Sequence, residues 1–234
     1  MAGEGNRFLN EGWTTPKPLI PLHGKPLFQH AIGSVHIDNA SMKYSFIVRQ
    51  NHIDEYGIDK GILSFLPDAN IFSVPKTTRG AVETCLRAEN AIDDNDAVLV
   101  MDCDLEFRSK QFTENIKAAL SKSGEAAEGG ALVSFESDSS KYSYAEIDDN
   151  SIVLRTAEKE VISSHALCGA YFFSSGKRFK QIAHQLMNEQ NFTKPEYYIS
   201  LLYNYLIAAG EKVHLAPMEE YYSYGTPEEL KRYL

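Results

Sequence analysis

Residues 44–74 read YSFIVRQNHIDEYGIDKGILSFLPDANIFSV, and this stretch decides the fold class. Its two ends, 44–48 and 71–74, are short runs of β-branched and aromatic residues that are typical of buried strands. Between them, the apolar residues over 53–66 recur at the spacing of an amphipathic helix. A strand, a helix and a second strand in this order predict an α/β fold built on a mainly parallel sheet.

The same alternation continues on both sides of this stretch. Further strands are predicted at 98–101, 131–135 and 213–216, and further helices at 26–38, 80–92, 109–121, 177–187, 196–209 and from Pro227 onward. Short runs at 144–147, 152–154 and 170–173, separated by turn residues, indicate a small β-rich lobe. A length of 234 residues fits a single domain that contains both parts.

The composition excludes several classes of protein. A net charge of −9 argues against a nucleic-acid groove, which needs a basic surface. The three cysteines form no CxxC pair, and the histidines, His52 among them, lack the spacing of metal ligands, so neither a disulfide framework nor a zinc site is expected. The sequence shows no membrane span and no signal peptide, and a cytoplasmic location is expected.

The chain opens with a glycine-rich loop, MAGEGNRF at 1–8. Two glycines spaced by one residue, Gly3 and Gly5, would let backbone N–H groups curl around an anion. Arg7 would add a permanent positive charge. An ordinary turn also explains a loop of this kind, so its interpretation as an anion site depends on the motif that follows.

That next motif is PKPLIPLHGKPL at 16–27. Pro16 and Pro18 stiffen the backbone on either side of Lys17. The amine of Lys17 is therefore expected to be delivered from a rigid, extended segment, with Lys25 nearby in a supporting role. The alternative is a proline-rich surface loop.

Two acids follow the apolar run at 98–101, in the tripeptide Asp102-Cys103-Asp104. In a parallel sheet, ligands bind outside the carboxyl ends of the strands, where these side chains are expected to lie. Carboxylates at such a place suit Mg²⁺, which takes hard oxygen ligands together with phosphates. A pair of acids in a solvated loop is the alternative explanation.

GEGNRF at 3–8 followed by PKPLIPLHGKPL at 16–27 resembles the signature of the sugar-nucleotide pyrophosphorylases, a family of nucleotidyltransferases. The resemblance continues through TRGA at 78–81, the acids at 102–104, EK at 158–159, GAYF at 169–172 and GTPEEL at 225–230. It implies a Rossmann-like mixed sheet flanked by helices, with a small β-rich substrate lobe. It also implies a nucleotide-binding half at 1–135 and an acceptor-binding half at 136–234.

The resemblance further implies a role for each motif residue in magnesium-dependent transfer. Arg7, Lys17 and Asp104 would be catalytic: Lys17 would bridge the α-phosphate and the incoming phosphate, and Asp104 would be the principal Mg²⁺ ligand with Asp102 as the second. The predicted nucleotide-binding residues are Ala2, Gly3, Gly5, Thr78, Gly80, Glu83 and Asp102. The predicted acceptor-binding residues are Lys25, Glu158, Lys159, Gly169 and Tyr171.

Structural explanations remain open for several of these residues. A helix cap explains Thr78 as well as contact with a nucleobase does. Glu158 and Lys159, taken as a bare dipeptide, would be surface residues. Tyr171 in an apolar strand needs no ligand to explain it.

Two features depart from the family pattern. Many relatives carry an aspartate two residues before the terminal Gly-Thr-Pro as a second metal ligand, where this chain has Ser223. Either Asp102 then supplies the second carboxylate, or phosphates hold more of the metal. The family also has a buried strand before the glycine loop, whereas the loop here starts at Met1, so the native start is expected to lie upstream.

The leading hypothesis is an enzyme that joins a nucleoside triphosphate to a sugar 1-phosphate or a phospho-alcohol head group, for surface polysaccharide, with release of pyrophosphate. One alternative is a glycosyltransferase that uses Asp102-Cys103-Asp104 as its DxD motif. Another is a nucleotide-binding relative without turnover. The sequence leaves open which nucleotide and which acceptor are used, and whether the stripe at 197–209 is core or the face of a homodimer.

Overall fold

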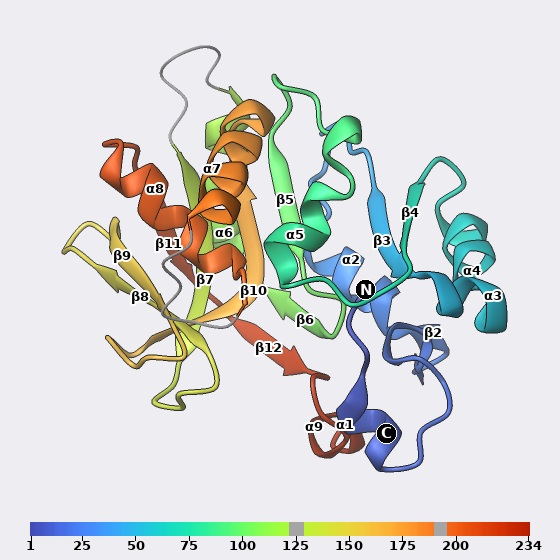
Figure 1. Ribbon diagram of the computed structural model, residues 1–234. Helices are drawn as coiled ribbons and strands as arrows, with labels where there is room; N and C mark the ends of the chain where they lie inside the picture. The colour runs from blue at the N-terminus through green and yellow to red at the C-terminus, as the bar shows by residue number, and fades with distance from the viewer. Residues whose placement is uncertain (122–128, 190–195) are drawn as a thin grey trace. The chain divides into compact units, whose positions relative to one another are not determined.

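The computed structural model describes residues 1–121, 129–189 and 196–234 (Figure 1). They form two compact units, each assembled from segments that are distant in the sequence. Unit 1 contains residues 1–78, 101–107 and 221–234, and unit 2 contains residues 79–100 and 108–220. The boundary does not follow the halves expected at 1–135 and 136–234, because the chain passes repeatedly from one unit to the other.

Unit 1 is built around the predicted strand–helix–strand stretch. Strand β3 (Ser45–Arg49) pairs in parallel with β4 (Asn70–Val74), as Figure 1 shows. The connection is two helices, α3 (Gln50–Tyr56) and α4 (Ile58–Phe65), where one was predicted. Gly57 separates them: its φ of 60° is left-handed, a conformation that glycine adopts at little cost and that ends the first helix.

The core of this part of unit 1 includes helix α2 (Leu27–Ser34). Phe28 from α2 packs with Val48 from β3 and with Ile58 and Ile62 from α4, and all four are buried. Burial of each such side chain contributes roughly 1.5–3 kcal/mol to folding. The apolar spacing that predicted the 53–66 helix is thus explained by the side chains that α4 buries.

The remaining elements of unit 1 are short. They are α1 (Asn6–Asn10), the 3₁₀ helix η1 (Lys17–Leu19), the hairpin of β1 (Pro21–Leu22) and β2 (Lys25–Pro26), the paired strands β6 (Leu105–Arg108) and β12 (Glu220–Ser223), and α9 (Pro227–Lys231). A second cluster includes Phe8, Ile20, Leu27, Tyr224 and Leu230. This cluster holds the glycine loop, the proline-rich motif and segment 221–234 in one core.

Unit 2 contains a six-stranded sheet. Its strands are β5 (Val98–Met101), β7 (Gly130–Glu136), β8 (Ser143–Ile147), β9 (Val153–Glu158), β10 (His165–Phe173) and β11 (Val213–Pro217). The order is β11-β7-β10-β8-β9, with β5 also on β10. Strand β7 is parallel to β11, but β10 runs antiparallel to both β7 and β8, and β8 is antiparallel to β9. The predicted mixed sheet is confirmed, but the prediction that it is mainly parallel is wrong for these strands.

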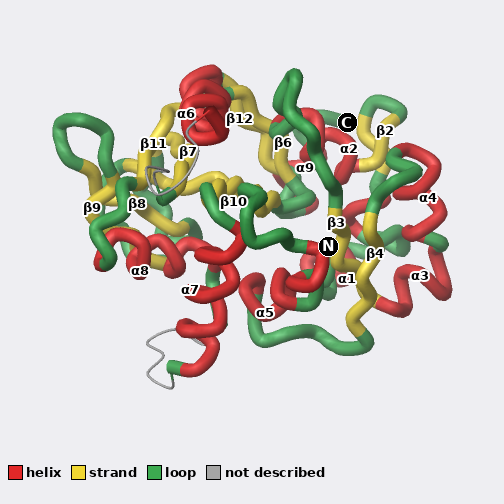
Figure 2. The backbone as a smooth tube through the Cα atoms, turned by 90° about the horizontal axis from the view of Figure 1, so that it is seen from above, coloured by secondary structure: helices red, strands yellow, loops and turns green. Residues whose placement is uncertain are grey.

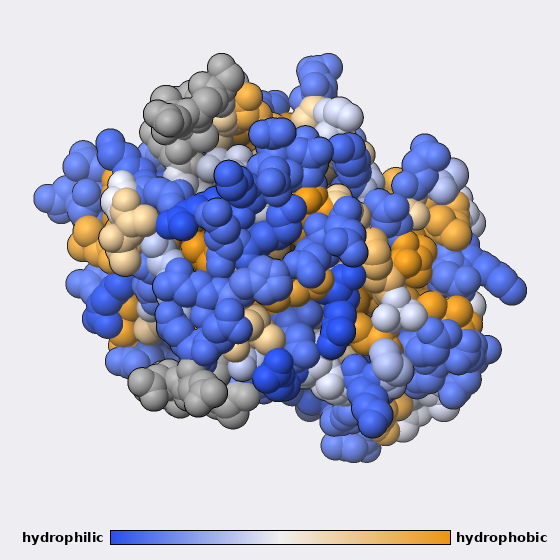
Figure 3. Space-filling view, turned by 45° about the horizontal axis from the view of Figure 1, so that its top comes forward, coloured by the Kyte–Doolittle hydropathy of each residue, from blue (hydrophilic) through white to orange (hydrophobic). Residues whose placement is uncertain are grey.

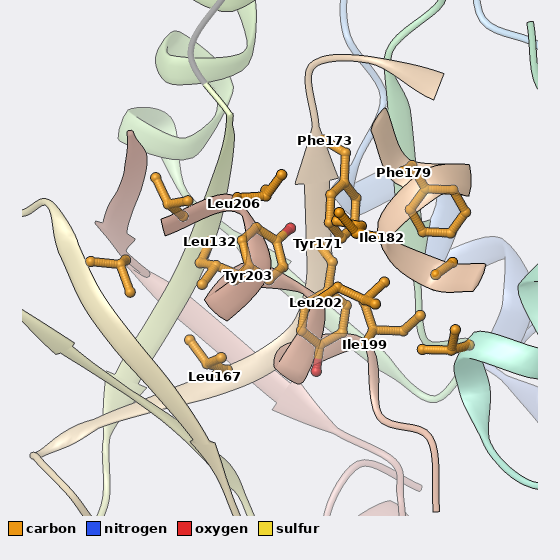
Figure 4. Close-up of a cluster of buried hydrophobic side chains, with 14 of the residues drawn as sticks. Leu132, Leu167, Tyr171, Phe173, Phe179, Ile182, Ile199, Leu202, Tyr203 and Leu206 are labelled. Atoms are coloured by element: carbon orange, nitrogen blue, oxygen red, sulfur yellow. The ribbon is translucent and has the colours of Figure 1, made fainter. Parts of the chain in front are cut away.

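Helices cover both faces of this sheet. Helix α6 (Lys110–Ser121) lies on one face and α7 (Gly176–Asn188) and α8 (Leu202–Ala208) lie on the other, as Figure 2 shows. Phe179 and Ile182 of α7 pack with Tyr203 of α8 and Phe173 of β10 (Figure 4). The predicted 80–92 helix is shorter, as α5 (Ala81–Leu86) and the 3₁₀ turn η2 (Glu89–Ala91).

The predicted 196–209 helix is likewise shorter, because it begins with the 3₁₀ turn η3 (Ile199–Leu201) before α8. The apolar stripe of this segment is core: Leu202, Tyr203 and Leu206 are fully buried. On the face drawn in Figure 3, hydrophilic side chains cover most of the surface. None of the helices in the described part of the chain is long and apolar enough to cross a membrane.

Candidate nucleotidyl-transfer site

The structure joins two of the predicted catalytic residues, Lys17 and Asp104, in unit 1. The Lys17 Nζ and Asp104 Oδ2 atoms are 2.6 Å apart, although the residues are 87 positions apart in the sequence. Lys17 begins η1, and Asp104 lies in the turn between β5 and β6. The prediction of an extended segment at Lys17 is wrong: Pro18 at the second position of a helical turn favours this 3₁₀ turn.

The pair is an ion pair held in partly water-excluded surroundings. The side chains of Lys17 and Asp104 are only 23% and 21% exposed. Burial opposes the charge on Lys17, but the neighbouring Asp104 carboxylate outweighs it and raises the pKa of Lys17 above its ordinary value. Burial likewise opposes the charge on Asp104, and the Lys17 ammonium nevertheless lowers the pKa of Asp104. Both groups are therefore charged at neutral pH.

Hydrogen bonds connect Tyr224 to Asp104 and to the nearby Glu106. The Tyr224 N–H donates to the Asp104 carbonyl oxygen over 2.8 Å. The Tyr224 hydroxyl donates to Glu106 Oε2 over 3.0 Å, and His30 Nδ1 lies 2.9 Å from the same carboxylate oxygen. Segment 221–234 is thus tied to the turn that presents the Asp104 carboxylate.

The glycine loop is shaped by its second glycine. Gly5 has a φ of 71°, which favours glycine, and its carbonyl oxygen accepts from the Phe8 and Leu9 N–H groups as α1 begins. Gly3 is exposed and Ala2 is buried. Arg7 is an exposed residue of α1.

A cavity of about 210 Å³ lies between this loop and strand β3, wholly within unit 1. The lining residues are Glu4, Gly5, Asn6, Phe8, Leu9, Thr14, Thr15, Pro16, Lys17, Arg49, Asn51, His52 and Tyr56. The sequence motifs did not identify Arg49, and His52 was not predicted to belong to the site. The position of Arg49 at the end of a predicted parallel strand could have identified it. Arg49 is the last residue of β3, and ligands bind outside the carboxyl ends of parallel strands.

Three oxygen atoms of the kind that bind divalent cations lie near Gly225, on the side where a Cβ atom would point. A Cβ placed on Gly225 would lie 3.3 Å from Glu229 Oε2, 3.5 Å from Asp104 Oδ2 and 3.8 Å from Ser223 Oγ. Ser223, found where many relatives carry an aspartate, donates its hydroxyl to Glu229 Oε2 over 2.7 Å. Two carboxylates and a hydroxyl are the hard oxygen donors that Mg²⁺ accepts.

These donors do not complete a metal shell. Among the residues that the structure describes, no three histidine, cysteine or acidic side chains are close enough to hold a metal ion. Mg²⁺ is commonly bound by one or two protein carboxylates together with substrate phosphates. A cation at these oxygen atoms would therefore need further ligands from outside the described residues.

The family model for nucleotidyl transferases matches residues 1–221. The chain belongs to the nucleotidyl transferase family. This confirms the resemblance drawn from the glycine loop and the proline-rich motif, and with it the expectation of an enzyme. No curated protein sequence is similar enough to match the chain.

Two solved structures share the fold of this nucleotidyl transferase. A nucleoside-diphosphate-sugar pyrophosphorylase from Vibrio cholerae RC9 is 26% identical, with a TM-score of 0.82 over 100% of this chain and 97% of that chain. The inositol-1-phosphate CTP transferase from T. maritima is 14% identical, with a TM-score of 0.73 over 99% of this chain and 90% of that chain. At the latter identity, the likeness concerns the fold alone.

The residues expected to read the nucleobase already have partners within the chain of this nucleotidyl transferase. In unit 2, a Cβ on Gly80 would lie 2.4 Å from the Tyr197 backbone nitrogen. The space that the missing side chain leaves is therefore occupied by the Tyr197 backbone. Glu83 accepts from the Arg79 N–H over 2.7 Å and also pairs with Arg87. Thr78 belongs to unit 1 and is partly buried.

The residues expected to bind the acceptor fall into both units. Lys25 is exposed on β2 in unit 1. In unit 2, Glu158 is 6% exposed and accepts hydrogen bonds from the Ser143 and Ser200 hydroxyls over 2.5 and 2.8 Å. The alternative explanation, a surface position for Glu158, is wrong, because the residue is buried and both hydroxyls donate to its Oε2 atom in the interior.

Lys159, Gly169 and Tyr171 also lie in unit 2. The Lys159 ammonium lies 2.6 Å from the Tyr198 hydroxyl and 4.8 Å from the centre of its ring. Gly169 has a φ of 91° within β10, between Leu167 and Tyr171, where the register with β7 shifts. Tyr171 is a member of the buried cluster in Figure 4, which supports a packing role.

Proposed function

We propose that this nucleotidyl transferase converts a nucleoside triphosphate and a sugar 1-phosphate, or a similar phospho-alcohol, into a nucleoside-diphosphate-linked product and pyrophosphate. The observation that carries the proposal is the Lys17–Asp104 pair, 2.6 Å apart beside the glycine loop of the family motif. Asp104 supplies a carboxylate that can hold a cation, and Lys17 supplies a positively charged ammonium. Phosphoryl transfer needs both kinds of group, and the fold brings them together from distant segments.

In the proposed reaction, a phosphate oxygen of the acceptor attacks the α-phosphorus of the triphosphate. The bond between that phosphorus and the oxygen that bridges to the β-phosphate breaks, and its electron pair leaves with pyrophosphate. No proton has to be moved, so the protein's task is to position two anions and to stabilise charge around one phosphorus. Lys17 would contact the α-phosphate and the incoming phosphate, and Gly3, Gly5 and Arg7 would hold the remaining phosphates.

The cation proposed for this reaction is Mg²⁺. Asp104 would be its principal protein ligand, Glu229 and Asp102 are the carboxylates available to support it, and phosphate oxygens would complete its shell. When bound, the cation neutralises phosphate charge. Binding of the cation to Asp104 would also free the Lys17 ammonium to contact a phosphate oxygen.

The proposal is tested by measuring pyrophosphate release for four triphosphates against sugar 1-phosphates and phospho-alcohols, with and without Mg²⁺. At least one pair is expected to release pyrophosphate in the presence of Mg²⁺, and Asp104→Asn, which keeps the shape of the side chain, is expected to remove most of that activity. Arg155→Gln, a change at an exposed position of β9, is the control and should keep it. Release of free nucleoside diphosphate from an activated sugar would identify a glycosyltransferase instead.

A further inference from the structure

Helix α2 supplies one side chain, His30, that contacts both of the chain segments from which the Lys17–Asp104 pair is built. Lys17 belongs to the segment that continues into β1, and Asp104 directly precedes β6. The Nε2 atom of His30 lies 2.9 Å from the carbonyl oxygen of Leu22, the last residue of β1. Its Nδ1 atom lies 2.9 Å from Oε2 of Glu106 in β6. The imidazole therefore bridges the two segments within unit 1.

Both ring nitrogens of His30 face hydrogen-bond acceptors. The Leu22 carbonyl oxygen has no proton to donate, and Glu106 Oε2 already accepts from the Tyr224 hydroxyl over 3.0 Å. Burial and the Glu106 carboxylate raise the pKa of Tyr224, so this hydroxyl keeps its proton. A neutral imidazole has a single N–H and can donate to only one of the two oxygens, whereas the imidazolium donates to both. The complete bridge therefore requires the doubly protonated ring.

The surroundings of His30 hold its ring in one orientation. The side chain is 12% exposed, and the ring makes an edge contact with the Tyr224 ring, with 6.1 Å between their centres. One turn further along α2, Ser34 accepts from the Phe107 N–H over 2.9 Å and donates to the His30 carbonyl oxygen over 3.3 Å. In the described structure, the titratable groups that face the ring are Glu106 from β6 and Tyr224 from segment 221–234.

The bridge bears on the distance between Lys17 and Asp104. Leu22 follows Lys17 by five positions, and Glu106 follows Asp104 by two. A shift of either segment would therefore move one member of the pair relative to the other. Because a misplacement of about 1 Å can slow an enzymatic reaction by about 10²-fold, a bond that fixes both segments affects the rate without touching the substrate.

We propose that His30 is a positioning residue of the nucleotidyl-transfer site, whose imidazolium links β1 to β6 and thereby fixes the distance between Lys17 and Asp104. The inference rests on the proposed function, because the pair affects a rate only if it acts on the phosphates. Loss of one ring proton leaves one of the two oxygens without its donor, so transfer slows as the pH rises. The Lys17–Asp104 pair stays charged around neutral pH and does not itself produce this change.

The test compares His30→Asn and His30→Gln with the wild type in the pyrophosphate-release assay, over a pH range on both sides of neutrality. The asparagine amide can replace the N–H at Nδ1 and the glutamine amide the N–H at Nε2, so each variant keeps one half of the bridge. Each is expected to lower kcat about tenfold, the effect of one lost hydrogen bond, with little change in the KM for the triphosphate. The fall of kcat between neutral and alkaline pH is expected in the wild type and not in the variants.

Two further variants separate positioning from general stability. His184→Asn is the matched control, because His184 lies 2.7 Å from Glu89 Oε2 in unit 2, and it should keep the wild-type kcat and pH profile. Ser34→Ala removes the neighbouring bond between α2 and β6. It is expected to lower the free energy of unfolding in urea and to keep the wild-type pH profile, because the His30 bridge remains.

NMR of isotope-labelled histidine rings measures the bridge without turnover, with His30→Asn to assign the signals. Both ring nitrogens of His30 are expected to carry protons at neutral pH, and a ring with a single proton there would overturn the bridge. Wild-type kcat in both His30 variants, or pH profiles parallel to that of the wild type, would overturn the positioning role while the proposed function stands. If the ring is doubly protonated but no substrate pair turns over, the bridge stands and the proposed function fails, together with the positioning role that rests on it.

Discussion

The Lys17–Asp104 pair of unit 1 and the Glu158 carboxylate of unit 2 belong to motifs of the same family, but their surroundings differ. Asp104 faces an ammonium 2.6 Å away, and both side chains retain about a fifth of their exposure. Glu158 faces two serine hydroxyls and is almost fully buried. The first site keeps charge and access that a ligand can use, whereas in the second the chain itself donates two hydrogen bonds to one carboxylate oxygen in the interior.

A motif acid therefore has to be judged by its partners. Neutral donors to a buried carboxylate favour a structural role, since a ligand that takes the same oxygen has to break those bonds. An ion pair with remaining access can exchange one partner for a substrate phosphate or a cation.

The largest effect is expected from Lys17→Met, which keeps the length of the side chain and removes its charge. Pyrophosphate release is expected to slow by about 10²–10³-fold, the usual loss for one preorganised donor. The matched change is Lys159→Met in unit 2, where the ammonium already contacts Tyr198. Its effect should be smaller and should appear in the KM for the acceptor. Equal losses of kcat in both variants would remove the distinction between the two regions.

The second effect concerns stability. Glu158→Ala leaves the Ser143 and Ser200 hydroxyls without their acceptor, and the free energy of unfolding is expected to fall by about 1–3 kcal/mol. Glu158→Gln keeps an acceptor oxygen and should cost less. Urea denaturation followed by circular dichroism measures both. An alanine variant as stable as the wild type, with a raised KM for the acceptor, would return Glu158 to the substrate site.

The smallest effect is expected from Glu229→Gln, which tests the oxygen atoms around Gly225. The affinity for Mg²⁺ in the presence of the triphosphate is expected to fall by about threefold to tenfold, since phosphates supply most of the ligands. Calorimetric titration with Mg²⁺ measures this affinity directly. Glu228→Gln, one position earlier and exposed, is the control. If the control loses as much affinity as Glu229→Gln, general surface charge rather than a ligand role explains the change.

Much of the fold could be predicted because apolar periodicity reports local structure. Strands β3, β4 and β5 and helices α6 and α7 fall close to their predicted ranges. The break at Gly57 was missed because the apolar pattern continues across it. The relative direction of the strands could not be predicted from the apolar pattern either. Strand β10 pairs antiparallel with β7, and the alternation of strands and helices along the sequence does not determine strand direction.

The candidate site was predictable where a motif carries the chemistry itself. Lys17 and Asp104 came from such motifs, and the structure places them in contact. Arg49 and His52 belong to no such motif, and the fold alone places them in the cavity beside the glycine loop. The surroundings of Gly80 and Glu158 were not predictable for a related reason, since their neighbours, Tyr197 and Ser200, lie far along the chain.

The three-segment make-up of unit 1 bears on how the polypeptide matures during synthesis. Residues 1–78 leave the ribosome first, but β12, Tyr224 and α9 follow only after all of 108–220 has been translated. The N–H of Tyr224 that holds the Asp104 turn therefore arrives only after unit 2 has been translated. Nascent domains fold largely in the order in which they leave the ribosome. Unit 2 can therefore form its sheet before unit 1 has received residues 221–234. We expect the Lys17–Asp104 pair to be held in its final position only after residues 221–234 have been translated.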